Sequence, residues 1–295
     1  MKPINKTFPS LRQMIFSGVT ALVIGLLFAP SAFAAGGGSY PQIQRQEWSF
    51  AGFFGKYDKA QLQRGFGVYN EVCAACHGLK YLSYRNLMQK GGPEFSKAQA
   101  LAIAKEATVI DGVDGNGDPL ERPGKLSDNF VSPFANEAAA RTANNGAYPP
   151  DLSLMAKART YHRNVPWYTE PYYWFYDMAT TYEEKGIDYI YALLTGYKTA
   201  PRGMTVGDGM YYNEYFPGHQ IAMASPLTAD AVEYADGTPT TLEQHAKDVT
   251  AFMAWASEPH LNARKDLGKR VMLYLVLLVI LMYLAKRRVW SRAKH

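Results

Sequence analysis

Cys73-Ala74-Ala75-Cys76-His77 is the stretch that decides the fold of this chain. A C-x-x-C-H run is the attachment sequence of a c-type haem, in which two thiols bond the porphyrin and the next histidine is the proximal ligand of the iron. The chain has two cysteines, both in this motif. None is left for a structural disulfide, a four-cysteine zinc site or an iron-sulfur cluster. The motif therefore predicts one covalently bound haem c, attached at Cys73 and Cys76 with His77 on the iron.

A dithiol redox pair of the thioredoxin kind is the main alternative for these two cysteines. That motif needs a strand before it and a helix that opens at it. Residues 62–72 are instead rich in Gly and Gln, and Phe66 and Tyr69 lie at helical spacing. A helix leading into the motif favours the haem, while a haem-free dithiol or structural protein stays open.

The N-terminal residues predict export. Three cations in the first twelve residues precede an apolar run over 14–28, and Ala32-Phe33-Ala34 matches the small-x-small pattern of a signal-peptidase site. The run is short for a membrane span and is followed by small residues and glycines. We therefore expect residues 1–34 to be a cleaved signal peptide. Export suits the haem, because its thioether bonds are made outside the cytoplasmic membrane.

The C-terminal residues predict a membrane anchor. Residues 271–285 are continuously apolar and are bounded by basic residues on both sides. A helix over 267–290 would be about 36 Å long, enough for a hydrocarbon core of roughly 30 Å, with Tyr283 and Trp290 near a headgroup layer. A buried core helix is the alternative. We expect residues 264–295 to be a single-pass transmembrane anchor with a short basic cytoplasmic tail, which leaves residues 35–263 in the periplasm of a bacterial inner membrane.

The basic excess of the chain lies at its ends. The formal net charge is +5, but the signal region holds three basic residues and no acids, and residues 264–295 hold nine basic residues and one acid. The exported body is therefore acidic. This excludes nucleic acid as the expected partner and suits docking of a basic soluble protein. Acids concentrate in residues 106–121 and 170–188, although a single carboxylate is most often part of a solvated face.

The body is predicted to be mainly α, a c-type cytochrome domain with long loop insertions. Strand-like alternation is scarce, and residues 111–119 form a turn-rich loop. This loop resembles the start of a calcium-binding loop, but Pro119 and Lys125 stand where glycine and glutamate are needed. We interpret it as a surface loop. Helical spacing is found in residues 59–72, 86–89, 96–108, 136–144, 152–159, 187–194 and 241–255.

An electron-carrying haem also needs a sixth ligand, for which methionine and histidine are the ordinary candidates. Several of each follow the motif, and most are expected to serve packing or the surface. Met223 is favoured because Pro217 and Pro226 bracket an irregular segment that can be held against a haem face. His219 in the same segment is its nearest competitor.

Beyond the motif, an ordered set of blocks resembles the cytochrome c1 family, the haem subunits of the cytochrome bc1 complex. C-x-x-C-H alone is common to all c-type cytochromes, whereas the ordered set is specific and covers most of the mature chain. Its further blocks are residues 64–69, 84–87, 122–128, 143–153, 193–197, 217–227, 236–239 and 254–259.

The resemblance implies a role for each of six residues. Cys73 and Cys76 would hold the haem, and His77 and Met223 would ligate its iron. Arg159 and Tyr189 would lie near the propionates, where a guanidinium offsets their charge; an exposed arginine and a packed tyrosine are the alternative interpretations.

The resemblance also implies partners and a function. The protein would carry one electron at a time from a Rieske iron-sulfur protein to a cytochrome c, together with cytochrome b in a dimeric complex, and would not be an enzyme by itself. The alternative is another membrane-anchored monohaem cytochrome that donates to a terminal oxidase or serves a dehydrogenase.

Residues 160–185 depart from the resemblance. They are rich in Trp and Tyr and look longer than the same region of the shortest family members. The segment could pack over the body, meet a neighbouring subunit or extend a docking rim. Some bacterial relatives brace this region with a disulfide, so aromatic packing in its place is a further hypothesis.

Overall fold

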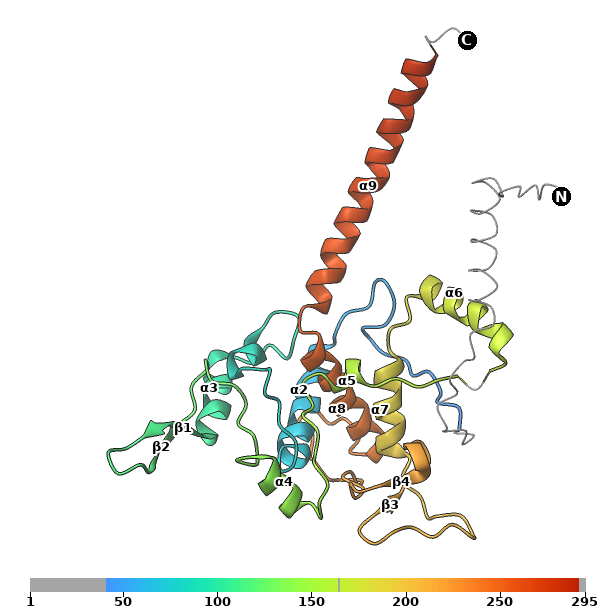
Figure 1. Ribbon diagram of the computed structural model, residues 1–295. Helices are drawn as coiled ribbons and strands as arrows, with labels where there is room; N and C mark the ends of the chain where they lie inside the picture. Colours follow the sequence, from blue (N-terminus) through green and yellow to red (C-terminus); the bar gives the residue numbers. More distant parts are fainter. Residues whose placement is uncertain (1–40, 164, 292–295) are drawn as a thin grey trace, which may run out of the picture. The chain divides into compact units, whose positions relative to one another are not determined.

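The computed structural model describes residues 41–163 and 165–291. The predicted signal peptide, residues 1–34, lies outside the described residues. Within them the chain is mainly helical, with short antiparallel strand pairs, which confirms the predicted fold class (Figure 1).

Two helices from opposite ends of the body form its centre, α2 (Lys59–Val68) and α8 (Leu242–Ser257). Asp58 and Thr241 cap their N termini, each side chain accepting a hydrogen bond from the backbone N–H three residues on. Helices α5 and α7 pack on α8 in turn. The resulting core includes side chains of α8 with no exposed surface, such as Phe252 and Trp255.

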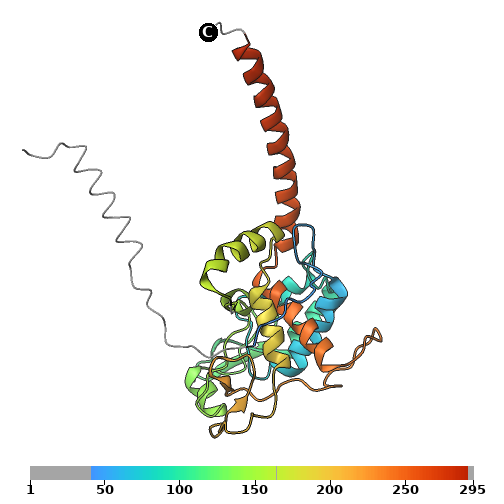
Figure 2. The ribbon, with the colours of Figure 1, turned by 90° about the vertical axis from the view of Figure 1, so that its right-hand side faces the viewer.

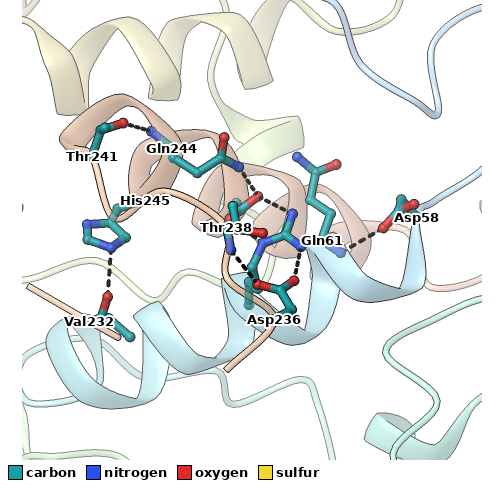
Figure 3. Close-up of polar contacts among 10 residues, drawn as sticks. Asp58, Gln61, Val232, Asp236, Thr238, Thr241, Gln244 and His245 are labelled. Atoms are coloured by element: carbon teal, nitrogen blue, oxygen red, sulfur yellow. Dashed lines mark hydrogen bonds and ion pairs between the residues drawn. The ribbon is translucent and has the colours of Figure 1, made fainter. Parts of the chain in front are cut away.

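The crossing of α2 and α8 depends on a glycine. A Cβ at Gly65 would lie 2.1 Å from the backbone oxygen of Asp248 and 2.8 Å from Cβ of Phe252. Only the missing side chain lets the two backbones come this close. Asp248 is fully buried there, and Arg64 Nε donates to its carboxylate over 2.8 Å. Asp236 also accepts from Arg64, and Gln244 donates to Asp248. Figure 3 shows Asp236 and Gln244 among the polar contacts of this region.

Helix α2 does not run into the haem motif as one α-helix. It ends at Val68 and continues as a π-helical turn, η1 (Tyr69–Cys73), where the backbone N–H of Ala74 donates to Tyr69 O over 2.8 Å. The predicted helix over 59–72 is thus confirmed in position, with a different last turn. Single π turns are frequent at functional sites, because the extra residue changes the direction of the side chains that follow.

The other predicted helices are present with shifted bounds, and α6 was not predicted. The predicted helix over 152–159 shrinks to the four residues of α5. The remaining helical elements are η2 (Tyr84–Met88), α3 (Lys97–Glu106), α4 (Glu137–Ala143), α5 (Met155–Ala158), η3 (Trp167–Thr169), α6 (Glu170–Thr180), α7 (Lys185–Thr195) and η4 (Pro217–His219).

The described strands form two hairpins. β1 (Thr108–Val113) pairs with β2 (Pro119–Pro123), and β3 (Tyr211–Tyr212) pairs with β4 (Gln220–Ile221). The turn-rich segment predicted as a surface loop includes the β1–β2 turn, where the carboxylate of Asp114 accepts hydrogen bonds from two backbone N–H groups of the turn.

The C-terminal helix α9 (Leu261–Trp290) is long and apolar enough to cross a membrane. From Val271 to Ser291 every residue is exposed, as expected for a segment that faces lipid. Its first turns contact the body: Lys265 Nζ donates to the carbonyl oxygens of Phe50 and Gly52 over 2.5 and 2.6 Å. Figure 2 shows the same helix after a quarter turn.

Candidate functional site

The haem motif folds into a tight helical turn. The backbone N–H groups of Cys76 and His77 both donate to Cys73 O, over 3.1 and 2.9 Å. Both cysteines are half-buried, and Cys73 packs with Ala74 against the hydrophobic core. The turn therefore holds the two thiols and the imidazole close together, as attachment of one porphyrin through two thioethers requires.

The His77 ring is oriented by a residue far away in the sequence. Its Nδ1 lies 2.7 Å from the carbonyl oxygen of Pro150. A carbonyl only accepts, so Nδ1 carries the proton and the lone pair is on Nε2. Among the described residues none forms a hydrogen bond with Nε2. A histidine that donates one ring N–H to a backbone carbonyl and leaves the other nitrogen open has the usual arrangement of a metal ligand.

Burial also favours the neutral form of this ring. The pKa of His77 is lowered by burial, against the opposing effects of the Pro150 carbonyl and the Asp151 carboxylate. Neutral imidazole is the form that binds iron. Protonation state and orientation thus both suit a proximal ligand.

The segment around Pro150 is fastened to the residues that follow the motif. Leu152 N donates to Gly78 O over 2.9 Å, and Lys80 N donates to Asp151 Oδ2 over 2.9 Å. On the other side, the Tyr69 hydroxyl donates to His77 O over 3.0 Å. These contacts hold the His77 backbone and its ring partner in one unit.

We expect Asp151→Ala to loosen this unit. Asp151 accepts from the N–H groups of Lys80 and Ser153, and losing both contacts should lower the free energy of unfolding by about 1–2 kcal/mol. Denaturant unfolding of the holoprotein measures the change. Asp118→Asn, at the exposed β1–β2 turn, is the matched control and should stay within about 0.5 kcal/mol of the parent. Equal effects of the two substitutions would contradict the role of Asp151 in fastening the Pro150 segment to the residues after the motif.

The dithiol alternative is disfavoured by the environment of Cys73. Burial raises the pKa of its thiol to about 12, and the neighbouring Cys76 adds to the effect. A redox dithiol works with a thiol whose pKa is lowered, because the thiolate is the reactive form. A helical segment also precedes the motif where the dithiol fold would need a strand.

Met223 lies in an irregular segment that follows β4. It packs against the same hydrophobic core as Cys73, and its backbone oxygen accepts a hydrogen bond from the Tyr197 hydroxyl over 3.0 Å. His219, its competitor, instead stacks on Tyr212 with ring centroids 5.8 Å apart. Met223 therefore packs on the core, whereas the His219 ring is engaged by Tyr212.

The two residues expected near the propionates differ in burial. Tyr189 is buried in α7, and together with burial it raises the pKa of the Tyr197 hydroxyl, which places the two tyrosines close together. The Arg159 side chain is exposed at the end of α5, and no described residue forms an ion pair with it. Only the Arg159 backbone is drawn in, against Gly186 of α7. The structure thus links Tyr189 through Tyr197 to Met223, and the roles of Arg159 and Tyr189 at the propionates stay predictions.

Sequence reasoning missed Pro150 and Tyr197, which contact the two expected iron ligands directly. Both lie in blocks that resemble the family, residues 143–153 and 193–197. Neither a proline, which contributes only its backbone carbonyl, nor a single tyrosine indicates a contact with an iron ligand. The sequence alone therefore could not single them out.

The described residues fit a c-type haem. They supply two thiols on one turn, an oriented neutral imidazole with an open nitrogen, and a methionine that packs on the same core.

Comparisons with known proteins agree. Residues 48–293 match the model of the Cytochrome C1 family. The chain is 46% identical over 283 residues to "Cytochrome c1" of Blastochloris viridis, which covers 96% of this chain and 98% of that protein. It is 41% identical over 285 residues to "Cytochrome b-c1 complex catalytic subunit, mitochondrial" of Candida albicans, with 94% and 89% covered.

A longer relative is also similar. The chain is 51% identical over 246 residues to "Cytochrome b/c1" of Bradyrhizobium diazoefficiens, which covers 83% of this chain but only 35% of that protein. This chain thus spans about a third of that relative and nearly the whole length of the other two. By its matched family model and the identity to full-length relatives, the chain belongs to the cytochrome c1 family, which implies a haem cofactor.

Proposed function

We propose that the protein is the membrane-anchored haem subunit of a cytochrome bc1 complex. In this function it carries one electron at a time from a Rieske iron-sulfur protein to a cytochrome c, beside cytochrome b in a dimeric complex. The orientation of His77 by Pro150 carries the proposal, because it prepares one ring nitrogen for an iron next to two thiols on the same turn. The name of the Candida albicans relative supports the assignment to the complex.

The residues of the chain have distinct parts in this function. The haem, attached to Cys73 and Cys76, supplies the redox change of one electron. His77 would hold the iron on one side, with its ring fixed by Pro150. Met223, whose backbone is held by Tyr197, would be a second ligand of the iron, and a thioether ligand raises the reduction potential relative to a second imidazole. The buried hydrophobic core, against which Cys73 and Met223 pack, would limit the access of water to the haem.

The anchor and the predicted signal peptide support one orientation. Export would place the body in the periplasm, and α9 would carry its basic C-terminal end into the cytoplasm. Basic residues flank the apolar part of α9 on both sides, where they can reach headgroups. The alternative function, a monohaem donor to an oxidase or a dehydrogenase, would use the same anchor but no cytochrome b.

Burial excludes some of the acidic residues from the proposed docking of a basic partner. In residues 170–188, Asp188 and Glu184 are buried and Asp177 is bound to two cations. These three cannot meet a soluble partner. Asp118 and Glu121 of the β1–β2 hairpin are exposed, and neither forms an ion pair with a described residue. They are the better candidates for steering a basic cytochrome c toward the protein.

A redox titration tests the proposed function. The haem absorption of the purified full-length protein should follow a single one-electron transition at high potential. A strongly negative midpoint would contradict ligation by methionine and return the sixth position to His219. Mild solubilisation of native membranes should also retain cytochrome b with the protein; its absence, with an oxidase or dehydrogenase in its place, would favour the alternative function.

A further inference from the structure

Helix α6 turns its polar side toward the protein and its apolar side outward. Tyr173, Asp177 and Thr180, spaced along one face, are half-buried. On the opposite face Trp174 and Phe175 expose 61% and 58% of their surface. A surface helix of a soluble protein has the reverse arrangement. The outward face of α6 is therefore adapted to surroundings other than water.

The helix is held in this orientation by charges. Arg163 donates to both carboxylate oxygens of Asp177, over 2.8 and 2.7 Å, and Lys185 Nζ lies 3.0 Å from the same carboxylate. The Arg163 guanidinium also lies over the Tyr173 ring, 5.0 Å from its centre. Because these contacts occupy the inward face, the aromatic residues opposite are left outside. Other aromatic side chains of residues 160–185 do pack inward, since Tyr182 is buried and Tyr161 packs against the hydrophobic core. The hypothesis that aromatic packing replaces a disulfide in this region stays a prediction.

The aromatic surface continues beyond the helix. Trp167 and Tyr168, just before α6, expose 83% and 67% of their surface. Along α6, Tyr172 and Tyr176 stack on each other with ring centroids 6.3 Å apart and border the apolar face. Monomeric soluble proteins rarely expose contiguous apolar patches of this kind. Trp and Tyr beside apolar residues are the composition of the layer between lipid and water.

This surface adjoins the start of the membrane helix. The residues that follow α6 share a cavity of about 230 Å³ with the first turns of α9, lined by Thr181 and Glu183 on one side and by Arg264 and Gly268 on the other. Glu183 and Arg264 form an ion pair of 3.3 Å. Figures 1 and 2 both show α6 at the end of the body where α9 begins.

A second aromatic element lies beside the same turns of α9. Phe54, which exposes 77% of its surface, has the Lys269 ammonium 6.0 Å from its ring centre. Phe53 packs edge-on against it. Two separate parts of the body thus present aromatic side chains around the point where the apolar part of α9 starts.

We propose that α6, with Trp167 and the Phe53–Phe54 pair, is a lipid-binding surface that lies in the headgroup layer of the membrane crossed by α9. The inference rests on the proposed membrane anchoring. Lipid is the occupant that fits, because the surface is continuous with the base of the anchor and combines apolar side chains with bordering tyrosine hydroxyls. Contact at α6 in addition to α9 would restrict the tilt of the haem domain over the membrane.

Fluorescence quenching by brominated lipid tests this. The full-length holoprotein is placed in nanodiscs whose acyl chains carry bromine near the glycerol, and its tryptophan emission is divided by the emission in unbrominated nanodiscs. This ratio cancels the constant quenching by the haem. In a Trp290→Phe variant the remaining tryptophans are Trp48 and Trp255, which are buried, and Trp167 and Trp174 on the proposed surface. We expect emission to be quenched in this variant.

The matched variants separate the possible results. Adding Trp167→Phe and Trp174→Phe to Trp290→Phe should abolish the quenching while keeping an aromatic ring at each position. Equal emission of the Trp290→Phe variant in both lipids would overturn the lipid surface, and a spectral shift that occurs only when cytochrome b is added would assign the surface to a protein. The Trp167→Phe/Trp174→Phe variant retains Trp290 as a reporter of the anchor. If Trp290 is quenched and α6 is not, only this inference fails; if Trp290 is not quenched either, the anchoring fails with it.

Discussion

Replacing Met223 by leucine should leave the haem covalently attached and lower its reduction potential by on the order of 0.1 V or more. Axial ligands account for much of the range of about 0.8 V in reduction potential among haem proteins. The proposed thioethers at Cys73 and Cys76 would not depend on the sixth ligand. Leucine keeps the volume and the packing of the Met223 segment against the core. The potential is measured by titration of the haem absorption, and electron transfer from quinol to cytochrome c should be lost.

Two further methionines make this prediction specific. Met178→Leu, on the outward face of α6, is the control and should leave the potential unchanged. Met155 also packs against the core, in the short helix α5, and is tested as a second candidate. An unchanged potential in Met223→Leu together with a lowered one in Met155→Leu would move the sixth ligand to Met155.

Replacing Arg64 by methionine should destabilise the protein by about 3–5 kcal/mol, because it leaves the Asp248 carboxylate buried without its cation. Asp248 has no exposed surface and lies where α2 crosses α8, while Gln244 can supply only a neutral donor. The change is measured as the free energy of unfolding in denaturant of the full-length holoprotein in detergent. Methionine retains much of the apolar stem of arginine, so that the loss reports the charge.

A second substitution separates the charge from the packing. The double variant Arg64→Met with Asp248→Leu should recover much of the loss, because a buried ion pair replaced by apolar side chains is often nearly neutral. The exposed pair of Arg141 and Glu137, spaced i, i+4 in α4, gives the control: Arg141→Met should change stability by less than about 1 kcal/mol. A double variant as unstable as Arg64→Met alone would show that packing dominates.

Local patterns predicted much of the helical structure. Ser96 and Asn136 stand at the starts of α3 and α4, where their side chains cap the first backbone N–H groups. The prediction of α9 needed only the length and the composition of its apolar run. Helix α6 was missed because residues 172–176 are five consecutive aromatic residues without helical period, and because its half-buried face carries Asp177 and Thr180 in place of an apolar stripe.

The sequence by itself determined the haem motif, the long apolar run near the C-terminus, the acidic character of residues 35–263 and the membership in the cytochrome c1 family. These depend on residue types at short spacing. Only the tertiary structure decided that His77 is oriented by Pro150, that Met223 is linked to Tyr197, and that Asp188 is buried and not available for docking. These contacts join residues distant in the chain, and the polarity of a single residue does not reveal its partner or its burial. The packing of α2 and α8, made possible by the missing side chain of Gly65, brings such segments together.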